Sequence, residues 1–310
     1  MKKFIFYLIL LKKALLLIVY NMFRQKNRLC VNIRKSIENY IVFQPAKLRA
    51  VPLERDLLGK FKPIRFLTTD RVKIYAWFIE PKENMPTILY LHGQAESILK
   101  HQNVARFCLE NGFGLFLLSY RGHYKSSGRP TEKGVFTDAQ SALFQLEKMG
   151  IKTENVIAWG HSLGTVSAVE TAMNNNLMGI ILQSPIKDLK TGALDVVNFY
   201  CRRLHLPALT SLNHEIISNT DFVQKFDNLS KIKWVKCPVL LLHSKTDRIS
   251  PYTNSIALAE ANPNAVLKIH KRGSHWECNW CIDSIFEFIE TLEYNKTEKQ
   301  MLKHFQHENL

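Results

Sequence analysis

The five residues Gly160-His161-Ser162-Leu163-Gly164 match the pattern G-x-S-x-G, in which a serine lies on a sharp turn. A strand-like apolar run precedes the motif and a helical pattern follows it, which is the context that this pattern needs. Flanking glycines let the chain turn tightly enough to expose the hydroxyl, and the N-terminus of the following helix favours negative charge beside it. We therefore predict that Ser162 is a nucleophile and that Gly160, His161 and Gly164 build the turn that presents it.

A serine hydroxyl is a weak nucleophile that needs a general base, which a carboxylate in turn orients. In folds that carry a serine on such a turn, the acid follows the serine in the chain and the histidine comes last. Asp247 follows the apolar run 239–242 and His275 follows the run 265–269, so both lie on loops at the carboxyl ends of predicted strands. We expect His275 to accept the Ser162 proton and Asp247 to orient His275.

Other residues near these positions offer alternatives. Asp188 also follows a predicted strand and is an alternative acid. His270 lies at the end of its own strand and His243 precedes Asp247 within one loop, so we expect both histidines to serve structure. His161, beside the nucleophile, is expected to be a packing or loop residue.

The oxyanion that forms during acyl transfer needs two backbone N–H donors about 3 Å from its position. Leu163, the residue after the nucleophile, is expected to supply one of them. The second should come from the turn after the predicted strand 87–91, where His92-Gly93-Gln94 offers a glycine-allowed bend, and we assign it to Gln94. This chemistry needs neither a metal nor a cofactor, and we predict none.

The elements that must position these groups follow from the pattern of the chain. From Pro63 onward, strand-like and helix-like segments alternate, which predicts an α/β fold with a largely parallel central sheet flanked by helices. The runs 64–68 and 72–79 flank a turn and predict a hairpin. Residues 186–232 interrupt the alternation with an insertion that contains many apolar residues and is longer than a connection between two strands needs, which predicts a helical cap over the site. An ordinary pair of packing helices is the alternative for this segment.

Six cysteines in a chain of 310 residues do not indicate a disulfide framework. Cys278 and Cys281 have the C-x-x-C spacing of zinc and redox sites, but the sequence holds no second pair of this kind. We expect both cysteines to lie on the first turns of a helix.

The net charge of the chain is +15, from 42 basic and 27 acidic residues. Residues 1–50 hold eleven of the basic residues and one acid, Glu38, so this segment carries +10 and the remaining chain is only mildly basic. These charges bracket the run 4–23, which is apolar except for Lys12, Lys13 and Asn21. Basic residues beside an apolar segment indicate a membrane partner, and no recognition motif for nucleic acid is present.

About 20 apolar residues span the core of a bilayer, so the run 4–23 predicts a single membrane anchor. The central Lys12 and Lys13 favour a helix that lies in the membrane interface instead. A cleaved signal peptide fits the basic start, but the sequence shows no small-residue cleavage site. We expect a membrane location, with its orientation left open.

The span from Ile64 to Leu292 resembles the Bem46/ABHD13/ABHD17-like branch of the α/β-hydrolase superfamily, and more distantly the monoglyceride lipases and serine aminopeptidases. Besides the serine motif, the segments 120–126 (YRGHYKS) and 128–134 (GRPTEKG) resemble the D-Y-R-G-Y-G-x-S and G-x-P-S-E-x-G motifs of this branch. The triplet Gly273-Ser274-His275 resembles its G-T-H-N ending.

The sequence departs from this branch at three places. Ser119 replaces the usual aspartate, Tyr124 replaces a glycine, and Gln94-Ala95-Glu96-Ser97 stands where N-A-G-N is expected. Glu96 thereby removes a glycine beside the predicted oxyanion loop, which leaves the catalytic residues in place but alters the loop.

The resemblance implies an α/β-hydrolase fold and hydrolysis of esters or thioesters on acyl substrates, often lipids or acylated proteins. We divide the chain into an anchor and basic linker (1–50), a hydrolase domain with its cap (51–294) and a charged tail (295–310). We expect a membrane-associated serine hydrolase that cleaves a lipophilic acyl ester or thioester through an acyl-enzyme. A serine peptidase or aminopeptidase of the same fold, and a catalytically silent binding protein, are the alternatives.

Overall fold

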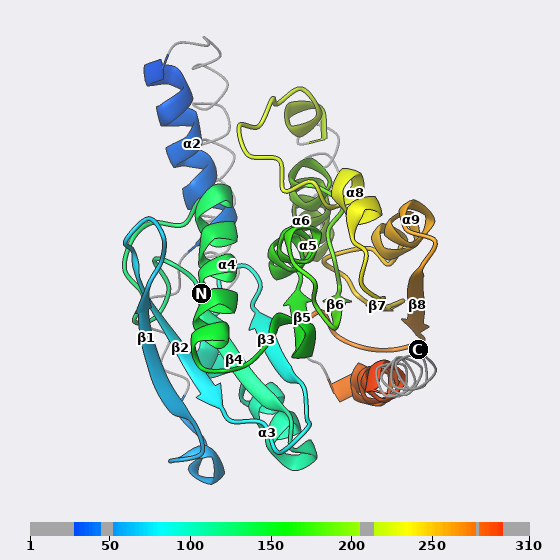
Figure 1. Cartoon of the computed structure of the whole chain (residues 1–310). Coiled ribbons are helices and arrows are strands. Elements are labelled where there is room, and N and C mark those ends of the chain that lie inside the picture. The colour runs from blue at the N-terminus through cyan, green and yellow to red at the C-terminus, as the bar shows by residue number, and fades with distance from the viewer. Residues whose placement is uncertain (1–27, 45–51, 205–213, 277–278, 294–310) are drawn as a thin grey trace, which may run out of the picture.

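An eight-stranded sheet, in the order β1-β2-β4-β3-β5-β6-β7-β8, runs through the computed structural model, which describes residues 28–44, 52–204, 214–276 and 279–293 (Figure 1). β2 is antiparallel to β1 and β4, and the other neighbouring strands are parallel. This confirms the predicted hairpin and the mostly parallel sheet. The strands are β1 (Lys62–Leu67), β2 (Lys73–Ile79), β3 (Thr87–Leu91), β4 (Gly114–Ser119), β5 (Val156–His161), β6 (Gly179–Gln183), β7 (Val239–Ser244) and β8 (Ala265–His270).

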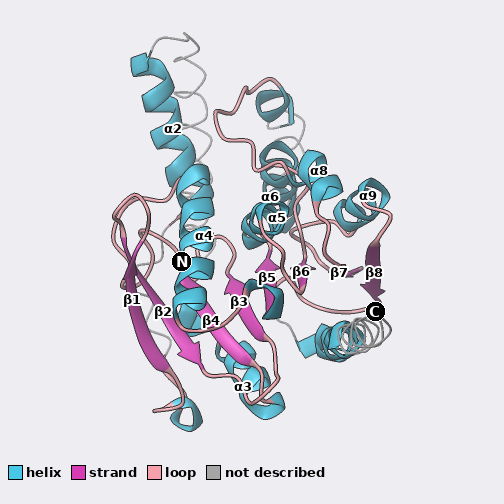
Figure 2. Cartoon of the chain, in the orientation of Figure 1, coloured by secondary structure: helices cyan, strands magenta, loops and turns pink. Residues whose placement is uncertain are grey.

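Helices cover both faces of this sheet (Figure 2). Successive strand residues point to opposite faces, so Leu89 and Leu91 pack on one face while Ile88 and Tyr90 pack on the other. The first face carries α4, α5 and α9, and the second carries α3 and the helix 282–293. The helices are α2 (Arg28–Phe43), α3 (Gln102–Asn111), α4 (Glu132–Lys148), α5 (Gly164–Asn174), α6 (Leu189–Leu204), α8 (Asn228–Lys231) and α9 (Thr253–Ala261), with further helical segments at 214–218 and 282–293.

The motif at residues 120–126 holds the loop between β4 and α4. Arg121 is buried and donates through Nε to Asp138 Oδ1 at 2.9 Å and through its two terminal nitrogens to Asp70 at 2.7 and 2.9 Å. The side-chain hydrogen bond from Arg121 lowers the pKa of Asp70 to about 2. Arg121 therefore joins the hairpin turn, which carries Asp70, to α4, which carries Asp138.

α2 differs from the basic linker that the sequence predicts at this place. Its buried side chains recur every four residues at Cys30, Arg34, Glu38 and Val42, and its last residue, Phe43, joins the core against the same sheet face as α4. Such spacing places one stripe of a helix against a partner surface. Two members of this stripe, Arg34 and Glu38, are charged, so the hydropathy pattern of the sequence does not reveal the buried face of α2.

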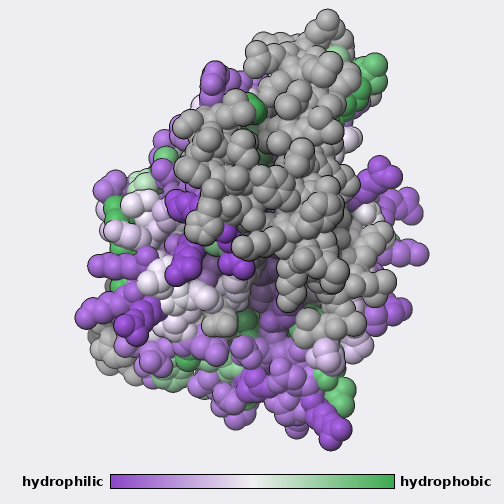
Figure 3. All heavy atoms as spheres, turned by 180° about the vertical axis from the view of Figure 1, so that it is seen from behind, coloured by the Kyte–Doolittle hydropathy of each residue, from purple (hydrophilic) through white to green (hydrophobic). Residues whose placement is uncertain are grey.

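Within the described residues, no helix combines the length and the apolar character needed to cross a bilayer. The predicted membrane segment 4–23, the tail 295–310 and Cys278 lie outside the described part of the chain. The face in Figure 3 is largely hydrophilic over its described residues, with hydrophobic side chains scattered among them.

Candidate active site

Ser162 lies in the tight turn between β5 and α5, as the motif predicts. Its φ angle is +50°, a left-handed conformation that is costly for a residue with a side chain. The neighbouring glycines leave room for this turn, since a Cβ atom on Gly164 would lie 1.9 Å from the carbonyl oxygen of Leu91. A Cβ atom on Gly160 would lie 2.6 Å from the Cα of Thr165. Both glycines are therefore required by close backbone approach.

The structure brings Ser162, His275 and Asp247 together at the carboxyl ends of the strands. Ser162 Oγ lies 3.0 Å from His275 Nε2, and His275 Nδ1 lies 2.7 Å from Asp247 Oδ2. The other carboxylate oxygen of Asp247 accepts the backbone N–H groups of Ile249 and Ser250 at 2.9 and 3.0 Å. With a carboxylate at Nδ1, the proton of a neutral His275 resides there, which leaves Nε2 free to accept a proton from the serine.

The electrostatics of the pair suit a neutral base beside a charged acid. Burial raises the pKa of Asp247, but hydrogen bonds from His243 and His275 outweigh burial and hold this pKa well below its usual range. Burial lowers the pKa of His275, although Asp247 opposes the shift. His275 is therefore neutral near pH 7, the form in which an imidazole can accept a proton.

The competing residues have other partners. Asp188 accepts the backbone N–H and the hydroxyl of Thr191 at 2.8 and 2.9 Å, so it holds the first turn of α6. His243 contacts the hydroxyl of Ser255 and the carbonyl of Ser250, and its Nε2 lies 3.4 Å from Asp247 Oδ2, so it braces the loop and the carboxylate of Asp247. His270 lies 3.1 Å from the hydroxyl of Ser284, toward the helix 282–293.

Gln94 and Leu163 both border the cavity that contains Ser162 and His275. Neither backbone N–H group has a hydrogen-bond partner among the residues that the structure describes. Two N–H groups left unpaired beside a nucleophile are what stabilisation of an oxyanion needs. The assignment of Gln94 and Leu163 as the oxyanion donors stays a prediction.

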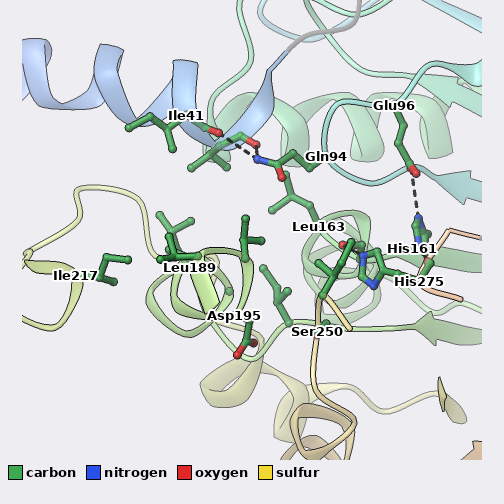
Figure 4. A pocket seen from close by; sticks show the side chains of 18 of the residues that line it. Ile41, Gln94, Glu96, His161, Leu163, Leu189, Asp195, Ile217, Ser250 and His275 are labelled. Carbon is green, nitrogen blue, oxygen red and sulfur yellow. Dashed lines mark hydrogen bonds and ion pairs between the residues drawn. The ribbon is translucent and has the colours of Figure 1, made fainter. Parts of the chain in front are cut away.

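A buried carboxylate, Glu96, occupies the position where the related branch has glycine. It accepts the backbone N–H of Gly93 at 2.6 Å and pairs with His101 Nε2 at 3.2 Å and His161 Nδ1 at 3.3 Å. Figure 4 shows the contact between Glu96 and His161, and the opposite nitrogen of His161 lies 2.6 Å from the carbonyl oxygen of His275. The side chain of Glu96 thus connects the predicted oxyanion loop, through His161, to the backbone of the candidate base.

Charge in this network is internally compensated. Burial lowers the pKa of His161, but the charge and hydrogen bond of Glu96 outweigh burial and raise it. The same histidines hold the pKa of Glu96 well below its usual range against the effect of burial. The sequence predicts a packing or loop role for His161, whereas the structure places it between Glu96 and the carbonyl of His275. The signal for this contact in the sequence is the departure from the related branch at Glu96.

A cavity of about 130 Å³ opens beside Ser162, and apolar side chains form most of its wall. The segment predicted as a cap contributes several of them, and α2 adds Ile41 and Val42. Figure 4 shows how this wall is shared between α2, α6 and the helical segment 214–218, which carries Ile217. The apolar residues that line the cavity are Ile41, Val42, Leu163, Ile186, Leu189, Ala193, Val196, Val197, Ile217, Phe222, Ile249 and Trp276.

Two features indicate the structural class of the protein. They are the mostly parallel sheet and the turn at its carboxyl edge that holds Ser162. The structure is similar to the Pyrococcus furiosus esterase Pf2001, with a TM-score of 0.64, over 81% of this chain and 97% of that chain at 21% sequence identity. At a sequence identity of 21%, this similarity shows the fold alone, and the fold is that of the α/β-hydrolases. In fold and in sequence, the chain is therefore similar to the α/β-hydrolase superfamily.

Residues 82–228 match the Hydrolase_4 family, described as "Serine aminopeptidase, S33". The human alpha/beta hydrolase domain-containing protein 17B is 29% identical over 180 residues, which cover 56% of this chain and 54% of the human protein. Protein bem46 of Schizosaccharomyces pombe is 28% identical over 249 residues, which cover 77% of this chain and 78% of that protein. The chain thus spans about half the length of the human relative, and the predicted resemblance is confirmed.

Proposed function

We propose that this α/β-hydrolase is a membrane-associated serine hydrolase that cleaves a carboxylic ester or thioester of a lipophilic acyl group. The observation that carries the proposal is the chain of contacts from Ser162 through His275 to Asp247, with distances of 3.0 and 2.7 Å, at the mouth of an apolar cavity. Two structural neighbours are esterases, which supports ester hydrolysis.

In the acylation step, Ser162 Oγ attacks the carbonyl carbon of the substrate while its proton passes to His275 Nε2. The carbonyl oxygen becomes an oxyanion, to which the N–H groups of Gln94 and Leu163 donate. When the tetrahedral intermediate collapses, the carbon–oxygen or carbon–sulfur bond to the leaving group breaks, and His275 returns the proton to the leaving alcohol or thiol. The acyl group remains on Ser162 as an ester.

In the deacylation step, water attacks the acyl-enzyme while His275 takes one of its protons. Collapse of the second intermediate releases the carboxylic acid and returns that proton to Ser162. Asp247 stays ionised throughout the reaction, because its low pKa makes proton transfer from His275 unfavourable. Its role is to orient the imidazole and to stabilise the imidazolium.

The apolar wall of the cavity supports an acyl chain as the group bound beside the serine. Each methylene that enters such a cavity from water gains about 0.8 kcal/mol, so a long acyl chain is favoured over a short one. A membrane location by way of residues 4–23 would place the protein where lipids and acylated proteins reside.

One polar feature of the cavity favours a second candidate, an aminopeptidase. Asp195 lines the cavity, and one of its oxygens accepts a hydrogen bond from Asn254 at 3.0 Å. Its other oxygen has no hydrogen-bond partner within the described residues, and a carboxylate in that position suits the ammonium group of a peptide N-terminus. The description of the matching family points the same way.

A substrate panel separates the two candidates. We would compare p-nitrophenyl esters, an acyl thioester and peptide anilides with a free N-terminus, with wild-type protein and Ser162→Ala. The proposal predicts turnover of the ester and the thioester that the substitution abolishes. Turnover of the anilides alone would favour the aminopeptidase and overturn the esterase proposal.

A further inference from the structure

The carboxyl end of α2 contacts the predicted oxyanion loop directly. The last carbonyl groups of a helix have no partner within the helix and must find one elsewhere. The side-chain amide of Gln94 donates to the carbonyl of Ile41 at 3.0 Å and to that of Val42 (Figure 4). The backbone N–H of Ala95 donates to the carbonyl of Phe43 at 3.1 Å. Three consecutive carbonyls of α2 therefore hold two consecutive residues of the loop.

α2 is in turn fixed to the cap segment. The buried carboxylate of Glu38 accepts the backbone N–H groups of Val223 and Gln224 at 2.5 and 2.9 Å. One turn earlier, Arg34 donates to the carbonyl of Asp221. Because these contacts lie on the same stripe of α2 as Val42, the helix has a defined position along its axis as well as around it.

The loop that α2 holds is strained. Ala95 has a φ angle of +56°, which a residue with a side chain adopts only when its surroundings impose it. On the other side of Gln94, the N–H of Gly93 is bound by the buried Glu96. Gln94 is thus held from both sides, and its own N–H has no partner within the described residues.

We infer that the side chain of Gln94 is a positioning group that uses α2 as its support to aim its own backbone N–H at the oxyanion. This inference rests on the proposed function, because it concerns the oxyanion of that reaction. It makes α2, the helix that follows the predicted membrane segment, a structural part of the oxyanion site. A substitution of the Gln94 side chain leaves the backbone N–H in place. The effect of losing the hydrogen bonds between this side chain and α2 can therefore be measured by itself.

The chain offers a matched control for this support. Gln44 also donates a side-chain N–H to the carbonyl of Ile41, at 3.0 Å, but it lies at the end of α2 and does not belong to the loop. Gln94→Leu and Gln44→Leu therefore each remove a hydrogen bond to the same carbonyl. Gln94→Glu keeps the shape of the side chain and removes its donor.

The test compares these variants by ester kinetics and by hydrogen–deuterium exchange of the loop 92–97. Loss of one oxyanion donor costs about 100- to 1,000-fold in kcat, and a misplaced donor less. We expect Gln94→Leu and Gln94→Glu to lower kcat about 10- to 100-fold with KM unchanged, and to exchange faster in the loop. Gln44→Leu should retain the wild-type kcat and loop exchange.

The outcomes separate the inference from the proposed function. Equal behaviour of Gln94→Leu and Gln44→Leu in both measurements would overturn the inference while an active wild type sustains the hydrolase proposal. An inactive wild type would overturn the proposed function, and the exchange measurement would then decide by itself whether Gln94 holds the loop. A rise in KM with kcat unchanged would also overturn the inference, because it would indicate a role in substrate binding.

Discussion

Narrowing the cavity beside Ser162 should change which acyl chains are hydrolysed. Ala193 on α6 lines this cavity, and its replacement by phenylalanine adds six carbon atoms to the wall. If the ring displaces three methylenes of a bound chain, the loss is about 2.4 kcal/mol, or roughly 60-fold in kcat/KM, at about 0.8 kcal/mol for each methylene. An acetyl group does not reach that far, so its hydrolysis should change little.

The assay is a series of p-nitrophenyl esters from acetate to dodecanoate. For the wild type, we expect kcat/KM to rise about fourfold for each added methylene until the cavity is full. In Ala193→Phe, we expect kcat/KM to stop rising at a shorter acyl chain, so that only the long-chain esters lose kcat/KM relative to the wild type. Asn198→Phe is the matched control, because Asn198 lies on the same helix but not on the cavity wall. Equal losses on acetate and dodecanoate, or no loss on either, would refute the assignment of the cavity to the acyl chain.

Three further predictions concern the base, the fold and the membrane segment. Burial lowers the pKa of His275, so kcat/KM should rise with pH through a midpoint below about 6.5 and be constant near pH 8; a midpoint above 7 would contradict the neutral base. Arg121→Met leaves the buried carboxylate of Asp138 without its cationic partner, and urea unfolding should show a free energy of unfolding lower by about 3–5 kcal/mol; a decrease of under about 1 kcal/mol would refute this role. Deletion of residues 1–27, which spares α2, should move the protein from the membrane pellet to the supernatant with its esterase activity retained; a truncated protein that still pellets would contradict the anchor.

The sheet and the residues at its carboxyl edge were accessible from the sequence because local patterns encode them. The strand-like run before Ser162 and the helical pattern after it specify the turn without reference to any distant residue. Asp247 and His275 could be placed because each directly follows a buried strand, and parallel strands bring their carboxyl ends to one edge. The structure joins them to Ser162 in the predicted order.

The parts that escaped prediction depend on contacts between segments far apart in the chain. Glu38 is a charged residue in a basic segment, and only its distant partners at Val223 and Gln224 explain why it is buried. The sequence shows that Glu96 departs from the related branch, but its contacts with His101 and His161 form only in the folded loop. The hydropathy and residue spacing of a single segment cannot predict either of these contacts, because each joins residues from different segments.

The central claim is that Ser162 is the nucleophile of an acyl-enzyme, and the most direct test is its covalent labelling by a fluorophosphonate. The protein would be treated with the probe, digested, and mapped by mass spectrometry, with Ser162→Ala as the control. Our account predicts modification of Ser162 in the wild type and no modification of the variant. An unlabelled wild type, or a label on another residue that persists in Ser162→Ala, would contradict it.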